Sequence, residues 1–325
     1  MNEKIRFVYL YVPFCLFLLF VSYFGPIMVC DIIFFSLMYA IASIGWAIGM
    51  YAGQLSFGHA AFFGIGAYVA AISYVKYHVT PWVAFIIAPL ISTLLAVAIT
   101  FPSARYGVRG PFYSLLTLAL AEVMRTTFLA WDFTGRALGV WYPIVPDSLI
   151  DFQFHSTHAP YVAIALIILT VGLSLLIKMQ QTRVSYGFIT TRNDEDAAQA
   201  IGVDTLKFRV LSSALSAIIT SMSGILYAQF TLFVSPENAI GTYVNVDILL
   251  PAVIGGVFSP YGPLLGSFII NPLMWLFRIL FGAEVLHMII RGILLVTMVY
   301  ISPRGLIGLF TKISSKKEGI GSEEA

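Results

Sequence analysis

Long apolar stretches separated by short polar ones dominate the pattern along this chain. A helix that crosses the hydrocarbon core of a bilayer needs about 20 mainly apolar residues. Segments of about this character span residues 7–24, 31–51, 57–75, 82–101, 112–131, 160–178, 208–233, 247–258, 264–281 and 286–301. The pattern therefore predicts an all-α, polytopic transmembrane helix bundle of about 8–10 segments, some of them broken or re-entrant.

Two of these segments are doubtful as complete spans. Residues 57–75 and 247–258 are short, rich in glycine or flanked by proline, which favours half-helices that meet inside the bundle. Non-helical backbone is tolerated at membrane depth only where protein or a water-filled cavity surrounds it. We therefore expect a solute pathway to pass near these breaks.

Composition supports a membrane protein. The 325 residues are 59% hydrophobic and 10% charged, whereas soluble domains carry about 25% charged residues. Such a chain cannot cover its surface against water, so lipid must surround it. A net charge of +2 is too small to indicate a nucleic-acid partner.

The positions of Lys and Arg predict how the chain is oriented. Basic residues gather at residues 4–6, 105–109, 178–209 and 312–317, each after an even number of predicted crossings. Basic loops favour the cytoplasmic side, so both termini are expected in the cytoplasm. The predicted organisation is a transmembrane domain over 1–311, with an external loop at 132–159 and a cytoplasmic loop at 179–207. A disordered cytoplasmic tail is expected over 312–325.

The cytoplasmic loop contains the pattern of a short helix. Asn193 is the expected N-cap, acidic residues fill the first turn, and Gly202 is the expected stop. Nearly all of its side chains are small, so another surface could approach its backbone. One interpretation is a coupling helix that docks on a cytoplasmic motor, and the alternative is a solvated, salt-bridged connector. The residues concerned are Arg192, Asn193, Asp194, Glu195, Ala197, Ala198 and Gly202.

Residues 52–71 read AGQLSFGHAAFFGIGAYVAA, which closely resembles the signature of LivM-type permeases of bacterial branched-chain amino-acid ABC importers. Further similar stretches follow in the family's order at 109–113, 117–125, 134–139, 192–202, 235–266 and 303–306. The matches run from about residue 45 to 310, and their ordered combination is more specific than any one of them.

The resemblance implies a membrane-spanning permease subunit of an ATP-driven importer. Such a machine moves branched-chain or hydrophobic amino acids across the inner membrane by alternating access. The expected partners are a second permease in a heterodimer, two cytoplasmic ATPases that bind ATP and Mg²⁺, and an external solute-binding protein. This chain has no G-x-x-x-x-G-K-[S/T] phosphate loop, so it is expected to be no enzyme and to hold no cofactor. Urea, short amides or another small solute are alternative substrates, and an ion-coupled transporter or channel is the alternative class.

Polar residues that the predicted segments place at membrane depth are candidates for the pathway, with interhelical hydrogen bonding or ion pairing as the alternative. They are Gln54, Ser56, His59, Thr117, Glu122 and Arg125. Arg291, one turn after His287, has the same ambiguity, with a structural role favoured.

Glycines and the external loop offer two further interpretations. Gly45, Gly49 and Gly53 recur every fourth residue, which predicts one helix face for close packing, and Gly255-Gly256 predicts a break. In the external loop, Asp147, Asp151, His155 and His158 have metal-like spacing. Proline and turn residues around them favour a solvated docking surface over a metal site.

Overall fold

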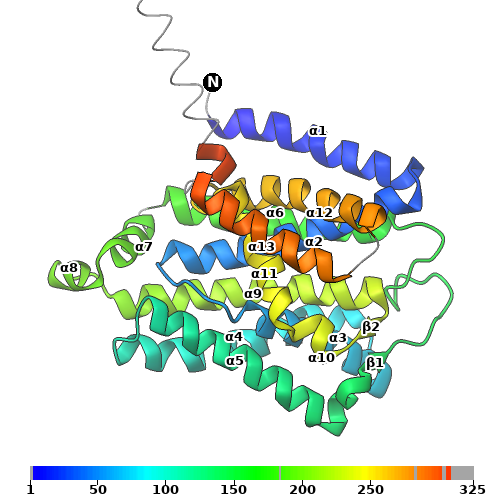
Figure 1. The fold of residues 1–325 in the computed structure, drawn as a ribbon, viewed down its shortest axis with the longest axis horizontal. Helices are drawn as coiled ribbons and strands as arrows, with labels where there is room; N and C mark the ends of the chain where they lie inside the picture. Colours follow the sequence, from blue (N-terminus) through cyan, green and yellow to red (C-terminus); the bar gives the residue numbers. More distant parts are fainter. Residues whose placement is uncertain (1–2, 183, 282–283, 302–304, 309–325) are drawn as a thin grey trace, which may run out of the picture.

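The computed structural model describes residues 3–182, 184–281, 284–301 and 305–308, and they form a helical bundle (Figure 1). The helices on the N-terminal side are α1 (Glu3–Phe24), α2 (Ile27–Tyr51), α3 (His59–Tyr77), α4 (Ala84–Arg105) and α5 (Pro111–Ala130). They are followed by α6 (Ala159–Gln181), α7 (Val184–Asn193), α8 (Glu195–Ala200), α9 (Thr205–Thr231), α10 (Pro236–Ile240), α11 (Thr242–Gly255), α12 (Gly262–Phe281) and α13 (Glu284–Ile301). Short 3₁₀ turns are η1 (Pro81–Val83), η2 (Asp132–Thr134) and η3 (Arg136–Leu138).

Within the described residues, eight helical segments are long and apolar enough to cross a membrane, by length and composition. This confirms the predicted polytopic helical fold. One of the eight, Pro236–Gly255, is divided between α10 and α11. Helix α1 contributes a shorter apolar stretch, Tyr11–Phe24.

Helix α9 lies at the centre of the bundle and packs on α2, α3 and α4. Its contact with α3 depends on glycine. A Cβ added to Gly66 would lie 1.9 Å from the carbonyl oxygen of Ser221, and one added to Gly224 would lie 1.9 Å from that of Phe63. Only a residue without a side chain allows the two backbones to come this close.

Residues 52–58 separate α2 from α3 and are not helical. Figure 1 shows this segment returning from the end of α2 toward the middle of the bundle, where α3 begins. The prediction for Gly53 was wrong in one respect. Because α2 ends at Tyr51, Gly53 does not share a helix face with Gly45 and Gly49. It has φ +79° and lies against the backbone of Arg192, whereas Gly45 and Gly49 face α9.

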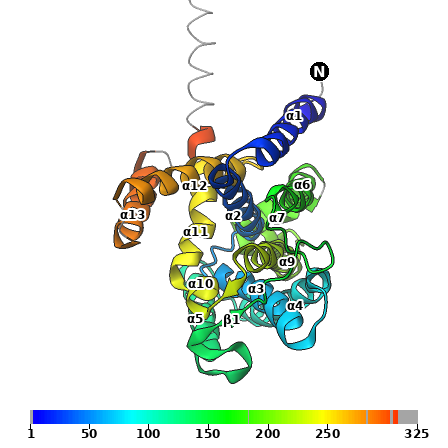
Figure 2. The ribbon, with the colours of Figure 1, turned by 90° about the vertical axis from the view of Figure 1, so that its right-hand side faces the viewer.

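The expectation that residues 57–75 form a broken span was wrong, because α3 is one continuous helix of 19 residues and counts among the eight. The second doubtful segment, 247–258, does belong to an interrupted span. Gly241 separates α10 from α11, and α11 ends at Gly255, followed by Gly256 at φ +117°. A Cβ on Gly255 would meet the carbonyl oxygen of Gly262 at 1.7 Å, so the turn into α12 is tightly closed. In Figure 2, where α9 is seen nearly end-on, α11 is seen from the side and so crosses the bundle obliquely.

A two-stranded antiparallel sheet fastens the loop between α5 and α6. Strand β1 (Val140–Trp141) pairs with β2 (Phe233–Val234), directly before α10. Two of the residues with metal-like spacing have partners elsewhere in the bundle: Asp151 accepts from the Tyr74 hydroxyl at 3.1 Å, and His158 pairs with Asp31 at 2.8 Å. Among the residues with defined placement, no group of three His, Cys, Asp or Glu side chains could hold a metal ion.

Candidate functional site

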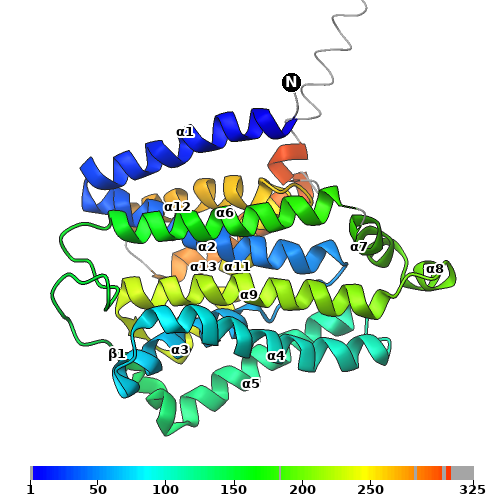
Figure 3. The same ribbon diagram turned by 180° about the vertical axis from the view of Figure 1, so that it is seen from behind.

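The loop between α6 and α9 is mostly helical, and it projects from one end of the bundle (Figure 3). It contains α7, which the sequence pattern did not reveal, and then α8. The predicted N-cap was wrong by one residue, because Asn193 ends α7 and Asp194 caps α8. Asp194 Oδ1 accepts the N–H groups of Asp196 at 2.9 Å and Ala197 at 3.0 Å. An aspartate accepts these bonds as well as an asparagine does and also complements the helix dipole.

Helix α8 has one face against the bundle and one free face. Ala198 is buried and Ala197 is exposed. At the end of the helix, Gly202 has φ +86° and follows the C-cap Ile201, where the sequence predicts the helix to stop. The small exposed side chains leave the outer face of α8 open to close approach.

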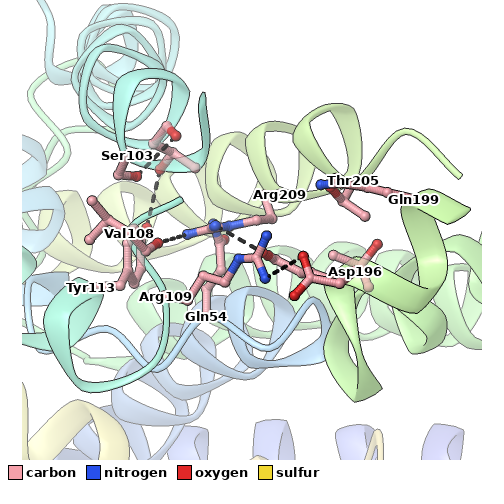
Figure 4. Close-up of polar contacts among 12 residues, drawn as sticks. Gln54, Ser103, Val108, Arg109, Tyr113, Asp196, Gln199, Thr205 and Arg209 are labelled. Atoms are coloured by element: carbon pink, nitrogen blue, oxygen red, sulfur yellow. Dashed lines mark hydrogen bonds and ion pairs between the residues drawn. The ribbon is translucent and has the colours of Figure 1, made fainter. Parts of the chain in front are cut away.

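Two arginines hold the first turn of α8 (Figure 4). Glu195 is paired with Arg109, from the turn between α4 and α5, and with Arg209 of α9, whose Nη1 lies 3.1 Å from Oε1. Arg109 also donates to Asp196 at 2.9 Å, and this hydrogen bond raises the pKa of the Arg109 guanidinium. Arg209 is almost fully buried and donates to the carbonyl oxygen of Val108 at 2.8 Å. Helix α8 is thus tied to two separate parts of the bundle.

Hydrogen bonds extend from this cluster to the broken segment before α3. One turn beyond Arg209, Ser212 and Ser213 donate to Gln54 Oε1 at 3.0 and 2.7 Å. Gln54, Arg109, Glu195 and Arg209 all line one cavity of about 220 Å³. The residues of α9 that bind α8 and those that bind Gln54 thus lie on adjacent turns of the same helix.

Arg192, at the end of α7, connects the same region to a third part of the chain. Its guanidinium lies 4.2 Å from the ring centroid of Phe258, in the turn between α11 and α12, and 5.6 Å from that of Tyr51. Cation–π contacts of this kind contribute about 0.5–2 kcal/mol. Both interrupted regions, 52–58 and 256–261, thus lie next to the α7–α8 unit.

Ser56, His59 and Thr117 are buried and hold the broken segment between helices. His59 Nε2 lies 2.7 Å from the Ser216 hydroxyl of α9, and Thr117 Oγ1 accepts the N–H of Phe57 at 3.1 Å. Ser56 Oγ accepts the N–H of Gly58 at 3.2 Å. The His59 contact joins two helices and the Thr117 contact joins α5 to the broken segment, whereas Ser56 bonds within that segment. The Thr117 and Ser56 bonds satisfy backbone N–H groups that hydrocarbon could not.

Glu122 and Arg125 form the predicted pair on α5, with Arg125 Nε 3.0 Å from Glu122 Oε2. The structure adds Glu237 of α10, which the sequence analysis missed and which pairs with Arg125 Nη1. A second pair, Arg291 Nη1 to Asp247 Oδ1 at 3.0 Å, joins α13 to α11. The Ser235-Pro236 motif could have drawn attention to Glu237, since it places this acid in the first turn of a helix.

Comparison with known proteins shows to which family this chain belongs. Residues 28–299 match the family described as "Branched-chain amino acid transport system / permease component". The chain belongs to this family. It is a multi-pass permease component of the branched-chain amino-acid ABC transport family, and not the ATPase. The family implies partner ATPases and a binding protein, and it implies no cofactor in the permease.

Two curated relatives are similar over most of this chain. "High-affinity branched-chain amino acid transport system permease protein LivM" of Escherichia coli is 24% identical over 320 residues, which cover 90% of this chain and 73% of the relative. The protein of the same name from Salmonella typhimurium is 23% identical over 312 residues, covering 85% and 69%. No solved structure matches. The resemblance to LivM-type permeases found in the sequence is confirmed.

Proposed function

We propose that this chain carries branched-chain amino acids across a bacterial inner membrane by alternating access, as a permease subunit of an ATP-driven importer. One observation carries the mechanism. Glu195 and Asp196, at the start of α8, are ion-paired to Arg109 and Arg209, and α9 in turn holds Gln54 of the broken segment. A force applied to α8 would reach the non-helical backbone through charged and hydrogen-bonded contacts.

In this proposal α8 is the coupling helix. Its exposed face, which includes Ala197, docks in a groove on a partner ATPase. ATP binding closes the ATPases and shifts α8 together with the inner ends of α5 and α9. The helices then tilt, and the solute site opens to the other side of the membrane. ATP and Mg²⁺ are bound by the ATPases.

The end of the bundle that carries α7 and α8 is proposed to face the cytoplasm. In Figure 1 the start of α1 lies toward the same end, and the β1–β2 sheet lies at the opposite end. Arg105, Arg109, Lys178, Arg192 and Lys207 also belong to the α7–α8 end, in agreement with the positive-inside rule. The loop 132–159 would then meet the external binding protein. The tail 312–325 lies outside the described residues.

A second permease is proposed to cover α5. Of the eight candidate spans α5 is the least buried, at 22% of its apolar window, although it carries the charged pair Glu122–Arg125. Charged side chains at membrane depth face protein or water rather than lipid. The family resemblance favours an unlike partner, and hence a heterodimer.

Purification of the complex from its native host tests this proposal. Two ATPase chains and a second permease are expected to co-purify. In proteoliposomes, L-leucine carried by the binding protein should stimulate ATP hydrolysis and accumulate only with ATP. Uptake of urea or acetamide in place of leucine would assign another substrate. Uptake that persists without ATP and collapses with the ion gradient would replace the proposal with an ion-coupled transporter.

A further inference from the structure

Two adjoining cavities lie where α2, α5, α10, α11, α12 and α13 meet. Figure 2 shows α13, α10 and α5 along one side of the molecule. Their volumes are about 620 Å³ and about 420 Å³. Glu237, Tyr243 and Arg291 line both cavities, so the two share a wall. Each volume falls in the range of roughly 300–1,000 Å³ that is typical of small-molecule sites.

The shared wall carries one acceptor and one donor group that the bundle does not use. Arg125 directs Nε and Nη2 to Glu122 and Nη1 to Glu237 Oε1. In the described part of the chain, Glu237 Oε2 has no hydrogen-bond partner. Among the described residues, Arg291 contacts an acid only through Nη1, which pairs with Asp247. Its Nε and Nη2 donors are therefore available. A carboxylate oxygen and a guanidinium fork therefore border the same space.

The charges around the cavities balance. Three acids are matched by three arginines in the described residues: Glu122, Glu237 and Asp247, and Arg125, Arg278 and Arg291. Charged groups in a membrane are costly, which makes such a cluster a functional site by default. A solute with a net charge would disturb the balance. A neutral amide would leave Glu237 Oε2 and the Arg291 fork without charged partners. A zwitterion satisfies both and adds no net charge.

The second cavity also offers an apolar surface. Phe35, Tyr39, Met274 and Trp275 line it, beside the charged wall. Small-molecule sites combine a mainly apolar lining with a few placed polar groups that fix orientation. This cavity therefore suits a compact aliphatic group whose charged end lies at Glu237 and Arg291.

The cavities lie on the solute's entry side in the proposed orientation. Glu237 follows β2 by three residues, and β2 pairs with β1 at the end of the bundle opposite α8 (Figure 1). A solute released by an external binding protein would meet this wall early in its passage.

We propose that Glu237 and Arg291 form a zwitterion-binding site, in which Glu237 accepts the α-ammonium group and Arg291 donates to the α-carboxylate of an aliphatic amino acid. This deepens the proposed function, on which it rests, because it selects amino acids over urea and short amides. The site works in addition to the selectivity of the binding protein and holds its solute weakly.

Saturation-transfer NMR on the purified permease–ATPase complex, without binding protein, tests the site. The probes are L-leucine, isocaproate, which lacks the ammonium group, and isopentylamine, which lacks the carboxylate. The wild-type complex is expected to bind L-leucine about tenfold more tightly than either analogue. Glu237→Gln should weaken leucine binding about tenfold and leave isocaproate binding unchanged. In this variant Arg125 still pairs with Glu122, so Arg125 keeps one of its two ion pairs.

Two further variants separate binding from folding. Arg291→Lys keeps the charge beside Asp247 but loses the guanidinium fork, so leucine should bind more weakly while the complex stays assembled. Asp132→Asn removes an exposed acid that is paired with Arg136 outside the cavities, and it should bind leucine as the wild type does.

The outcomes distinguish this site from the proposed function. Equal binding of leucine and isocaproate by the wild type, no leucine binding at all, or unchanged leucine binding by Glu237→Gln would each overturn the site. ATP-driven leucine uptake combined with an unaffected Glu237→Gln variant would overturn the site and support the proposed function. Leucine binding with the expected pattern, but without ATP-driven uptake, would support the site and overturn the proposed function.

Discussion

Glu195 of α8 lies within ion-pair distance of Arg209 of α9, with Oε1 3.1 Å from Nη1, and both side chains are largely buried. Arg209 is 2% exposed, so its charge depends on this partner and on the carbonyl oxygen of Val108. A buried ion pair of this kind connects two elements, and removal of one partner leaves the other charge buried and uncompensated. Here the two elements are the proposed coupling helix and the central helix of the bundle.

Replacement of Glu195 by Gln should destabilise the inner end of the bundle. The change leaves Arg209 without its charged partner, at a cost of about 3 kcal/mol. Denaturant titration of the protein in detergent measures the loss in the free energy of unfolding. The double variant Glu195→Gln/Arg209→Gln should be destabilised by less than the sum of the two single variants, because no buried charge is left unpaired. Strict additivity would show that the two side chains do not interact.

The same Glu195→Gln variant should also lower the number of solute molecules imported per ATP hydrolysed. Arg109 remains paired with Asp196, but α8 loses both ion pairs made by Glu195 and is held less firmly against α9. Uptake and phosphate release, measured in the same proteoliposomes, give the ratio. A normal ratio despite reduced stability would mean that the pair has no part in coupling.

Ala197→Arg should uncouple ATP hydrolysis from uptake without unfolding the chain. The side chain is exposed on the outer face of α8, so a long cation there would block a close-fitting partner and leave the bundle intact. Ala197→Ser is the matched control, because it keeps a small side chain and should couple normally. Membrane insertion and complex assembly are checked for both. Undiminished uptake by Ala197→Arg would rule out docking through this face.

Gly66→Ala should destabilise the bundle by about 1–3 kcal/mol, as expected for an overpacked contact. The added Cβ would lie 1.9 Å from the carbonyl oxygen of Ser221, and backbone cannot rotate away as a side chain can. Gly49→Ala is the control, since its Cβ would meet the Ser216 hydroxyl at 3.6 Å, an ordinary contact. Gly49→Ala should be neutral or slightly stabilising, because alanine favours helix over glycine. Detergent unfolding of the two variants, side by side, makes the comparison.

The external loop should loosen in acid through Asp147. Its carboxylate accepts hydrogen bonds from the Ser156 hydroxyl and from the N–H groups of His155 and Ser156, which lowers the pKa of Asp147. Because the pKa of Asp147 is lower in the folded state, its carboxylate stabilises the folded loop fully above the unfolded pKa of about 3.9. This stabilisation is lost as the pH falls through the folded pKa.

Limited proteolysis measures this transition in the loop. Cleavage within residues 144–156 should be constant above about pH 5 and increase as the pH falls below about 4 in the wild type. Asp147→Asn has no titrating group at this position, so its cleavage should vary less over the same range. An identical pH profile for the two proteins would show that another group controls the loop.

The helices were predictable because each depends on local sequence. Apolar runs long enough to cross a bilayer marked the spans, and glycine and proline marked the interruptions at 52–58 and 256–261. The position of the short helix at 194–201 was also predictable from its acids, alanines and Gly202. Its cap was not, because Asn193 and Asp194 are both good caps and the end of α7 decided between them. Helix α7 itself lacks a strong apolar period and was missed.

Sequence alone thus determined that the chain is a membrane protein, which segments are helical and which family it belongs to. Lipid exposure follows from composition, and helix formation follows from neighbours within a few residues. The sequence also predicted the pair Glu122–Arg125 within one helix, but only the tertiary structure decided which charges from distant segments meet. Arg125 and Glu237 are 112 residues apart, and Arg109 and Asp196 are 87 apart. A charge at membrane depth must find a partner, but packing of whole helices selects that partner, because the fold brings distant segments together.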